Sequence, residues 1–93
     1  MKTFKIVSKI DKGKYSEVEY HNSFEYKGFT WVPHREVSPF RGWKVTEYHT
    51  GFSHWHFSGS TKREAISNFR RSIDKVSKKK VRAAVSKPPR INP

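Results

Sequence analysis

The segment from Thr61 to Val76 constrains the fold most, because its pattern predicts a helix with a single apolar side. Thr61 is followed three residues later by Glu64, and this spacing matches a capping box at a helix start. At about 100° of rotation per residue, the apolar side chains fall within one stripe about 100° wide. These side chains are Ala65, Ile66, Phe69, Ile73 and Val76. Such a helix needs one surface to pack against, and the preceding residues must provide it.

Six stretches before this helix alternate apolar and polar residues, which is typical of half-buried strands. They cover residues 3–10, 15–21, 24–26, 29–34, 43–49 and 52–58. Turn residues such as Gly13, Gly28 and Gly51 separate them, because glycine adopts the positive φ of tight turns. Pro33 has no amide hydrogen, so its strand should end there or lie at a sheet edge. We therefore expect an α+β fold: an antiparallel β-sheet of about five or six strands packed by one C-terminal α-helix.

The last 16 residues, 78–93, have a different character from the rest of the chain. Three consecutive lysines precede a short apolar run, and a Pro-Pro pair follows it. These apolar residues are too few to be buried, so we expect a flexible basic C-terminal tail after a single α+β domain over residues 1–77. With 93 residues in all, the chain has room for only one core.

The composition excludes several classes of protein. The chain contains no Cys, which excludes disulfides, thiolate nucleophiles and cysteine-based zinc sites. No stretch approaches the roughly 20 apolar residues of a membrane span. Residues 1–10 also lack the apolar run of a signal peptide. We expect a protein of the cytoplasm without a membrane partner.

Positive charge is concentrated in the last third of the chain. Of the 20 Lys and Arg residues, eleven lie between Lys62 and Pro93, where only Glu64 and Asp74 oppose them. Clustered cations gain affinity for a phosphate backbone because they release its condensed counterions. A merely solvated charged face is the alternative interpretation. The segment thus predicts binding to nucleic acid (RNA or DNA) through Lys62, Arg63, Arg70, Arg71, Lys75, Lys78, Lys79, Lys80 and Arg82.

Aromatic and basic residues are interleaved on the predicted sheet, which is a second candidate surface. Trp31, Trp43 and Trp55 could stack on bases or form the core of a small domain. Strand alternation places Trp43 on the core side and Lys44 and Tyr48 on the other side. Since one helix covers only one face of a sheet, we expect the face of Lys44 and Tyr48 to stay open.

The five histidines were considered as metal ligands. His54 and His56 are two residues apart on a predicted strand, a spacing that can hold a metal ion. No carboxylate lies close to them in the sequence, so a site would need His34 or His49. The chain also lacks a Gly-rich phosphate loop, a Ser-His-Asp arrangement and a His-Asn-His nuclease motif. We expect no metal, no cofactor and no catalytic residues.

From Gly42 to Val76, the order of motifs resembles that of small nucleic-acid-binding domains. The motifs are Gly42-Trp43-Lys44-Val45, Thr50-Gly51 and the run 59–66. Three strands followed by a helix are similar to the AP2 plant-type DNA-binding domain and the arm-binding domain of tyrosine integrases. The second half of double-stranded-RNA-binding domains is similar more loosely. The pattern also resembles short basic proteins of phages and mobile elements.

This resemblance implies roles for particular residues. Lys62, Arg63 and Arg70 would meet backbone phosphates, whereas Arg41, Lys44 and Tyr48 would face a groove. The strong sequence signature of the AP2 family is absent. Strands also stand where a double-stranded-RNA-binding domain has its first helix.

The function we expect is non-catalytic binding of structured RNA or duplex DNA through the phosphate backbone. A small phage-encoded inhibitor of the anti-CRISPR type is the main alternative. It would bind the protein or the guide RNA of an RNA-guided nuclease. A third interpretation is a ribosome-associated or structural basic protein that binds RNA tightly and whose tail becomes ordered only inside an assembly such as a ribonucleoprotein complex. Sequence selectivity and oligomeric state do not follow from these patterns.

Overall fold

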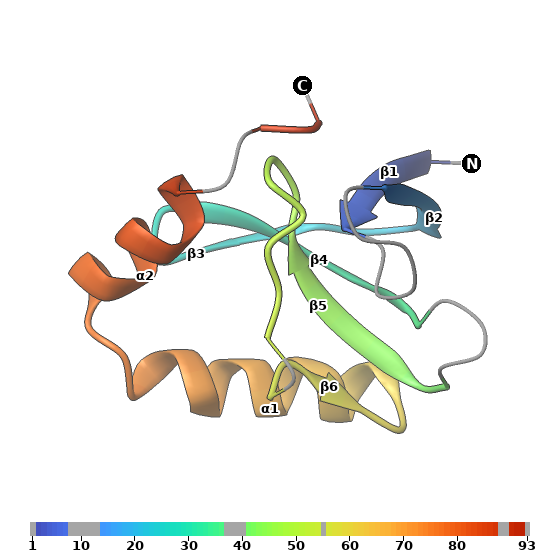
Figure 1. The fold of residues 1–93 in the computed structure, drawn as a ribbon. Coiled ribbons are helices and arrows are strands. Elements are labelled where there is room, and N and C mark those ends of the chain that lie inside the picture. Colours follow the sequence, from blue (N-terminus) through green and yellow to red (C-terminus); the bar gives the residue numbers. More distant parts are fainter. Residues whose placement is uncertain (1, 8–13, 37–40, 55, 88–89, 93) are drawn as a thin grey trace.

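The computed structural model describes residues 2–7, 14–36, 41–54, 56–87 and 90–92. Its elements are β1 (Lys2–Val7), β2 (Tyr15–Tyr20), β3 (Phe24–Tyr26), β4 (Phe29–Arg35), β5 (Trp43–Glu47), β6 (Ser58–Gly59), α1 (Lys62–Asp74) and α2 (Lys78–Ser86). The predicted α+β class is confirmed. The strands form two antiparallel sheets, β1–β2 and β3–β4–β5–β6, and two helices follow them (Figure 1).

Strands β3 and β4 form the predicted hairpin because their two-residue turn suits it. Lys27 and Gly28 both have positive φ, 56° and 85°, which is typical of a type I′ turn. Strand β4 continues two residues past Pro33 and pairs with β5. The pairing of β3 with β4 ends at Trp31, so β3 does not reach Pro33. Proline has no amide hydrogen, and at this position β3 offers no acceptor that would require one.

Helix α1 begins at the predicted capping box. The hydroxyl of Thr61 accepts a hydrogen bond from the amide of Glu64 at 3.1 Å. The helix packs against one face of the four-stranded sheet (Figure 1) and buries Ala65, Phe69 and Ile73. Val76 was predicted to belong to this apolar stripe, and that prediction is wrong. It lies beyond the end of the helix and is 38% exposed, because the helix stops at Asp74.

The main core surrounds the ring of Phe69. Its centroid lies 4.6 Å from that of Trp31 and 4.9 Å from that of Phe57. The interpretation of Trp31 as a core residue is therefore correct. Gly59 lets α1 approach the sheet, since a Cβ atom there would lie 2.7 Å from the amide nitrogen of Ala65.

The hairpin of β1 and β2 covers residues on the second face of the four-stranded sheet. Phe4 is buried, and its ring lies 5.5 Å from that of His34 and 5.8 Å from that of Tyr48. Tyr20 from β2 also contacts Tyr48. The prediction of an open face is therefore wrong, because aromatic residues of the hairpin pack on it.

Residues 52–58 do not form the long strand that their alternation predicts. Only Ser58–Gly59 pair with β5, and residues 52–54 have no strand geometry. The fully buried carboxylate of Glu47 accepts hydrogen bonds from the amides of His49 and Thr50 and thereby closes a tight turn. After this turn, isolated backbone hydrogen bonds connect the chain to β5. In one of them the amide of Glu47 donates to the carbonyl of Phe52 at 2.7 Å.

Residues 78–86 correct the prediction of a flexible tail, because they form the second helix, α2. Val81 and Val85 are buried in the same core as Phe69. Beyond the helix, Asn92 is buried, and its side chain bonds to the backbone of Lys5 and Tyr48. Two apolar residues at helical spacing were sufficient because the sheet offers them an apolar surface.

Some predictions fall outside the described residues. These are the turn at Gly13, the end of the first predicted strand and the role of Trp55. In the described part of the chain, neither helix is long and apolar enough to cross a bilayer.

Candidate nucleic-acid interface

Helix α2 presents the densest set of cations. Its first turn consists of Lys78, Lys79 and Lys80, and all three are exposed. The hydroxyl of Ser77 caps the helix by accepting from the amide of Lys80 at 3.3 Å. The free amides of a first turn carry partial positive charge. Three lysines at this position therefore destabilise the start of the helix by electrostatic repulsion. An approaching phosphate would relieve that repulsion.

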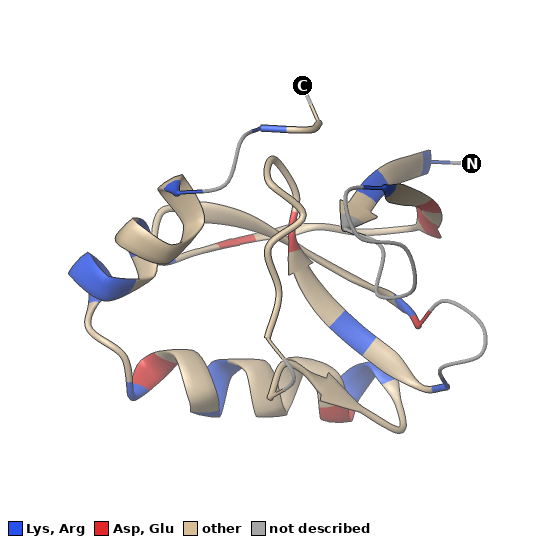
Figure 2. Cartoon of the chain, in the orientation of Figure 1, with Lys and Arg blue, Asp and Glu red and all other residues tan. Residues whose placement is uncertain are grey.

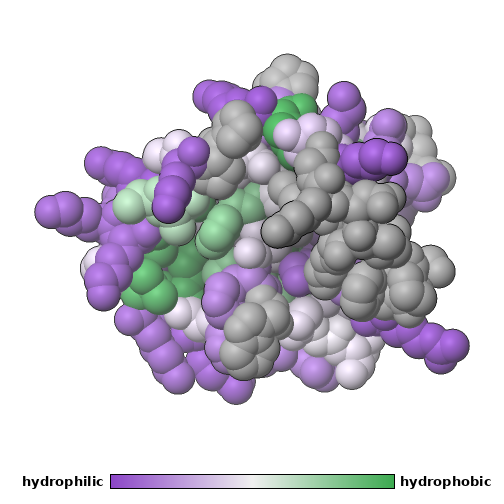
Figure 3. Space-filling view, viewed as in Figure 1, coloured by the Kyte–Doolittle hydropathy of each residue, from purple (hydrophilic) through white to green (hydrophobic). Residues whose placement is uncertain are grey.

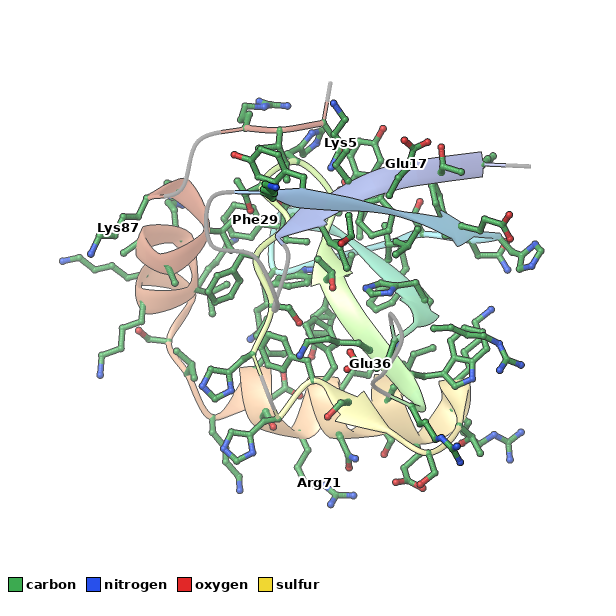
Figure 4. All side chains as sticks on the ribbon, turned by 45° about the vertical axis from the view of Figure 1, so that its right-hand side comes forward. Lys5, Glu17, Phe29, Glu36, Arg71 and Lys87 are labelled. Carbon is green, nitrogen blue, oxygen red and sulfur yellow. The ribbon has the colours of Figure 1, made fainter. Side chains whose placement is uncertain are left out.

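The second half of α1 adds cations on the side that faces residues 56–58. Arg71 and Lys75 line a surface hollow of about 560 Å³ together with His56 and Asn68. Asn68 is fixed in place, because its amide donates to the carbonyl of Ser58 at 2.9 Å. Figure 4 shows that Arg71 extends away from the body of the molecule. The hollow therefore combines two long cationic side chains with hydrogen-bond donors.

The few acidic residues of this region are already engaged. Asp74 accepts a hydrogen bond from the hydroxyl of Tyr26, and the Lys27 ammonium lies 3.7 Å from it. The hydrogen bond to Asp74 raises the pKa of Tyr26, so the phenol stays protonated and keeps donating. Glu64 is 3.3 Å from the amide of Ser60 at the start of α1. In the described residues, no ion pair neutralises Arg71, Lys75, Lys78, Lys79, Lys80 or Arg82.

We call these six residues, Arg71, Lys75, Lys78, Lys79, Lys80 and Arg82, the basic helical surface. They were all predicted from the sequence, and the structure brings them together at the end of α1 and on α2. Figure 2 shows the contrast between the two helices. Helix α1 contains acidic as well as basic residues, whereas all the charged residues of α2 are basic.

Three other predicted residues lie at or near the opposite end of α1. Lys62 and Arg63 are in its first turn. The Lys62 ammonium lies 6.0 Å from the ring centroid of Trp43, and the Arg35 guanidinium lies 5.2 Å from it. Arg41 lines a separate hollow with Glu36 and Glu64. Lys62 and Arg63 precede Arg71 by nine and eight residues, so at about 1.5 Å per residue they lie about 12 to 14 Å from it along α1.

Lys44 occupies a more enclosed position than the sequence suggested, whereas Arg70 is exposed. The Arg70 guanidinium lies 5.7 Å from the ring centroid of Tyr26, on the side of α1 that faces β3. Lys44 is only 8% exposed, and its ammonium lies 4.0 Å from the carboxylate of Glu36. Lys44 and Tyr48, which were predicted to face a groove from an open sheet, instead lie on the face that carries the β1–β2 hairpin. Their assignment to the interface is corrected for that reason.

Two histidines next to the basic helical surface form a stacked pair. The ring centroids of His54 and His56 are 5.0 Å apart, with an interplanar angle of 14°. Partial burial lowers the pKa of His54, and the nearby charges of His56 and Lys44 lower it further. His34, by contrast, is buried and bonds to the Arg35 carbonyl and the Thr46 hydroxyl. Within the described residues, no group of three potential ligands could hold a metal ion.

Sequence reasoning missed Asn68 and Ser72 at this interface, as well as the place of His56 beside Arg71. The i,i+2 spacing of His54 and His56 was noticed, but only as a possible metal motif. Both histidines lie outside any strand, although alternation predicts a strand over residues 52–58. When the chain is compared with protein-family models, with curated proteins and with solved structures, none of them matches it.

Proposed function

We propose that this protein binds nucleic acid without catalysis, and that the basic helical surface grips the phosphate backbone. The observation that carries the proposal is a set of exposed cations at the end of α1 and on α2 for which the described residues provide no acidic partner. Regular phosphate charges would both neutralise these cations and stabilise the first turn of α2.

The placement of charge supports a polyanion over a single small anion. Lys79 and Lys80 project from α2, whereas Arg71 and Lys75 project from α1, so the cations are spread over two elements. A chain of phosphates can contact several of them at once, whereas one small anion cannot. Arg63 and Lys62, about 12 to 14 Å from Arg71 along α1, could contact the same polymer further along.

The proposal is tested with two triple variants that remove the same charge from opposite sides of the molecule. The first replaces Lys78, Lys79 and Lys80 with Gln. The matched control replaces Lys2, Lys5 and Lys14 with Gln; these are exposed on or beside the β1–β2 hairpin. Affinity for duplex DNA, duplex RNA and single strands is measured by fluorescence anisotropy over a range of salt concentrations.

We expect the first variant to lose affinity and to lower the slope of log K against log salt. The slope should fall by about 0.7 to 0.9 for each lysine that contacts a phosphate. The control should keep the wild-type slope. Equal losses in both variants would show that net charge alone drives binding. Failure of the wild-type protein to bind any nucleic acid at low salt would overturn the proposal and favour a protein partner, such as the nuclease that an inhibitor would target.

A further inference from the structure

An apolar slot of about 230 Å³ lies between α2, the end of α1 and the described residues 52–54 and 56–57. Its walls come from the core and from both helices: Trp31, Phe52, Phe57, Ile73, Val76, Val81 and Ala84. Figure 3 shows apolar surface in this region, between α1 and α2, with hydrophilic side chains around it. The proposed backbone contacts make no use of this slot.

Exposed polar side chains border the slot, which continues into the hollow described above. His54, His56 and Lys80 contribute to the lining of the slot, and Lys80 adds a positive charge. His56 and Ser72 line both the slot and the hollow that contains Arg71 and Lys75. A ligand that fills the slot can therefore place a negative group against Arg71, Lys75 or Lys80 without leaving the surface.

The shape and the charge together limit the occupant. A purely apolar ligand would leave the surrounding cations unused, and a bare phosphate would gain nothing from an aromatic slot. A nucleobase joined to its phosphate meets both requirements, because its flat ring stacks on aromatic side chains while the backbone stays at the rim. The rings of His54 and His56 lie nearly parallel at the mouth and could stack on such a base.

We propose that this slot binds one unpaired base of a nucleic acid whose neighbouring phosphates lie on Arg71, Lys75 and Lys80. The inference rests on the proposed function and narrows its partner to single strands or to duplexes with an unpaired base. A base inside an intact duplex cannot enter the slot unless it leaves its stack, which costs free energy.

The test compares Ala84→Leu with Ala83→Leu. Ala84 lines the slot, so the larger side chain should fill it, whereas the neighbouring Ala83 is exposed and serves as the matched control. The probes are an oligouridylate strand with one central 2-aminopurine, a strand of the same length made only of abasic residues, and an intact duplex. Anisotropy gives the affinity, and 2-aminopurine fluorescence reports the environment of the base.

We expect wild-type protein and Ala83→Leu to bind the 2-aminopurine strand about tenfold more tightly than the abasic strand, as one stacked base would give. Ala84→Leu should lose this preference while its affinity for the abasic strand and the duplex stays unchanged. The abasic comparison in the wild type needs no variant, so it holds even if Ala84→Leu folds poorly.

Equal binding of both strands by the wild type would overturn the inference while leaving backbone binding in place. If none of the three probes binds at low salt, the proposed function fails as well. A wild type that self-associates, together with a monomeric Ala84→Leu and no base preference, would assign the slot to a second copy of the chain and also overturn the inference.

Discussion

The two helices begin with the same local motif but differ at one position. Each has a hydroxyl cap, Thr61 for α1 and Ser77 for α2, which accepts from the amide three residues later. That third residue is Glu64 in α1 and Lys80 in α2. An acidic residue stabilises the positive end of a helix and a lysine opposes it. Helix α1 therefore has the start that favours stability, whereas α2 has a cation where the proposed partner would contribute the negative charge.

The helices also differ in how they are held. Helix α1 buries Phe69 among the aromatic rings of the core, and Ala65 and Ile73 lie on the same side. Helix α2 buries Val81 and Val85 and leaves its lysines exposed. The comparison indicates that α1 holds the fold together, while α2 is more weakly anchored and leaves its cations exposed.

The largest expected effect comes from removing the anchor of each helix. Phe69→Ala should lower the free energy of unfolding by about 3 to 5 kcal/mol, because it leaves a cavity in the core. Val85→Ala removes about two methylene equivalents and should lower it by only about 1 to 2 kcal/mol. Urea unfolding followed by circular dichroism measures both. Ser67→Ala, on the exposed side of α1, is the control. Equal costs for Phe69→Ala and Val85→Ala would contradict the comparison.

Exchanging the residues at the third position of each helix should give a smaller effect with opposite signs. Glu64→Lys removes the acid from the α1 start and should lower stability by about 1 kcal/mol. Lys80→Glu creates a capping box with Ser77 and should raise stability by about 0.3 to 1 kcal/mol. Amide hydrogen exchange of residues in α2 measures the local gain.

The same two substitutions, Glu64→Lys and Lys80→Glu, separate an effect on stability from an effect on binding. Lys80→Glu should weaken binding to single strands although it stabilises α2, since it reverses a charge in the basic helical surface. Glu64→Lys should not weaken binding, because Glu64 lies at the other end of α1. A Lys80→Glu variant that is less stable than wild type would show that the lysine has a structural role that the comparison overlooks.

The smallest expected effect is a pH dependence at the edge of α2. The folded state lowers the pKa of His54, so the unfolded chain binds this proton more readily. Stability from this group is present above the ordinary histidine pKa of about 6.5 and is lost as the pH falls through the lower folded value. Bound nucleic acid should counteract the loss, because phosphates favour the charged imidazole.

His54→Gln should remove this part of the pH dependence, whereas His21→Gln, on the exposed segment after β2, should retain it. Thermal unfolding between pH 5 and 8, with and without an oligonucleotide, measures the difference. A His54→Gln variant with an unchanged profile would show that another group is responsible.

Local patterns predicted the parts of this fold that depend on local physics. The capping box and the stripe of Ala65, Phe69 and Ile73 depend only on helix geometry, and the turn at Lys27 and Gly28 depends only on backbone conformation. The sequence likewise predicted the exposure of every residue in the basic helical surface, because Lys and Arg are expected at the surface from their residue type alone.

The errors arose where distant segments decide the outcome. Val81 and Val85 are buried because the core happens to lie beside them, so local composition suggested a tail. The hairpin of β1 and β2 lies over Tyr48, and the sequence around Tyr48 contains no pattern that predicts this contact. The slot beside Ala84 is likewise lined by Phe52, His54, His56 and Phe57, which lie outside the strands that alternation predicted.

The bonds of Asn92 have a consequence for how the protein would meet a partner. Its side-chain amide joins the backbone of Lys5 to that of Tyr48, and the amides of Ile91 and Asn92 donate to the carbonyl of His49. Helix α2 thus lies between two fixed segments of the chain: α1 precedes it, and the hydrogen-bonded residues Ile91 and Asn92 follow it. Its conformational entropy is lost during folding, so little remains to be lost on association. Binding should then resemble rigid-body docking, with a heat-capacity change that reflects only the surface in contact.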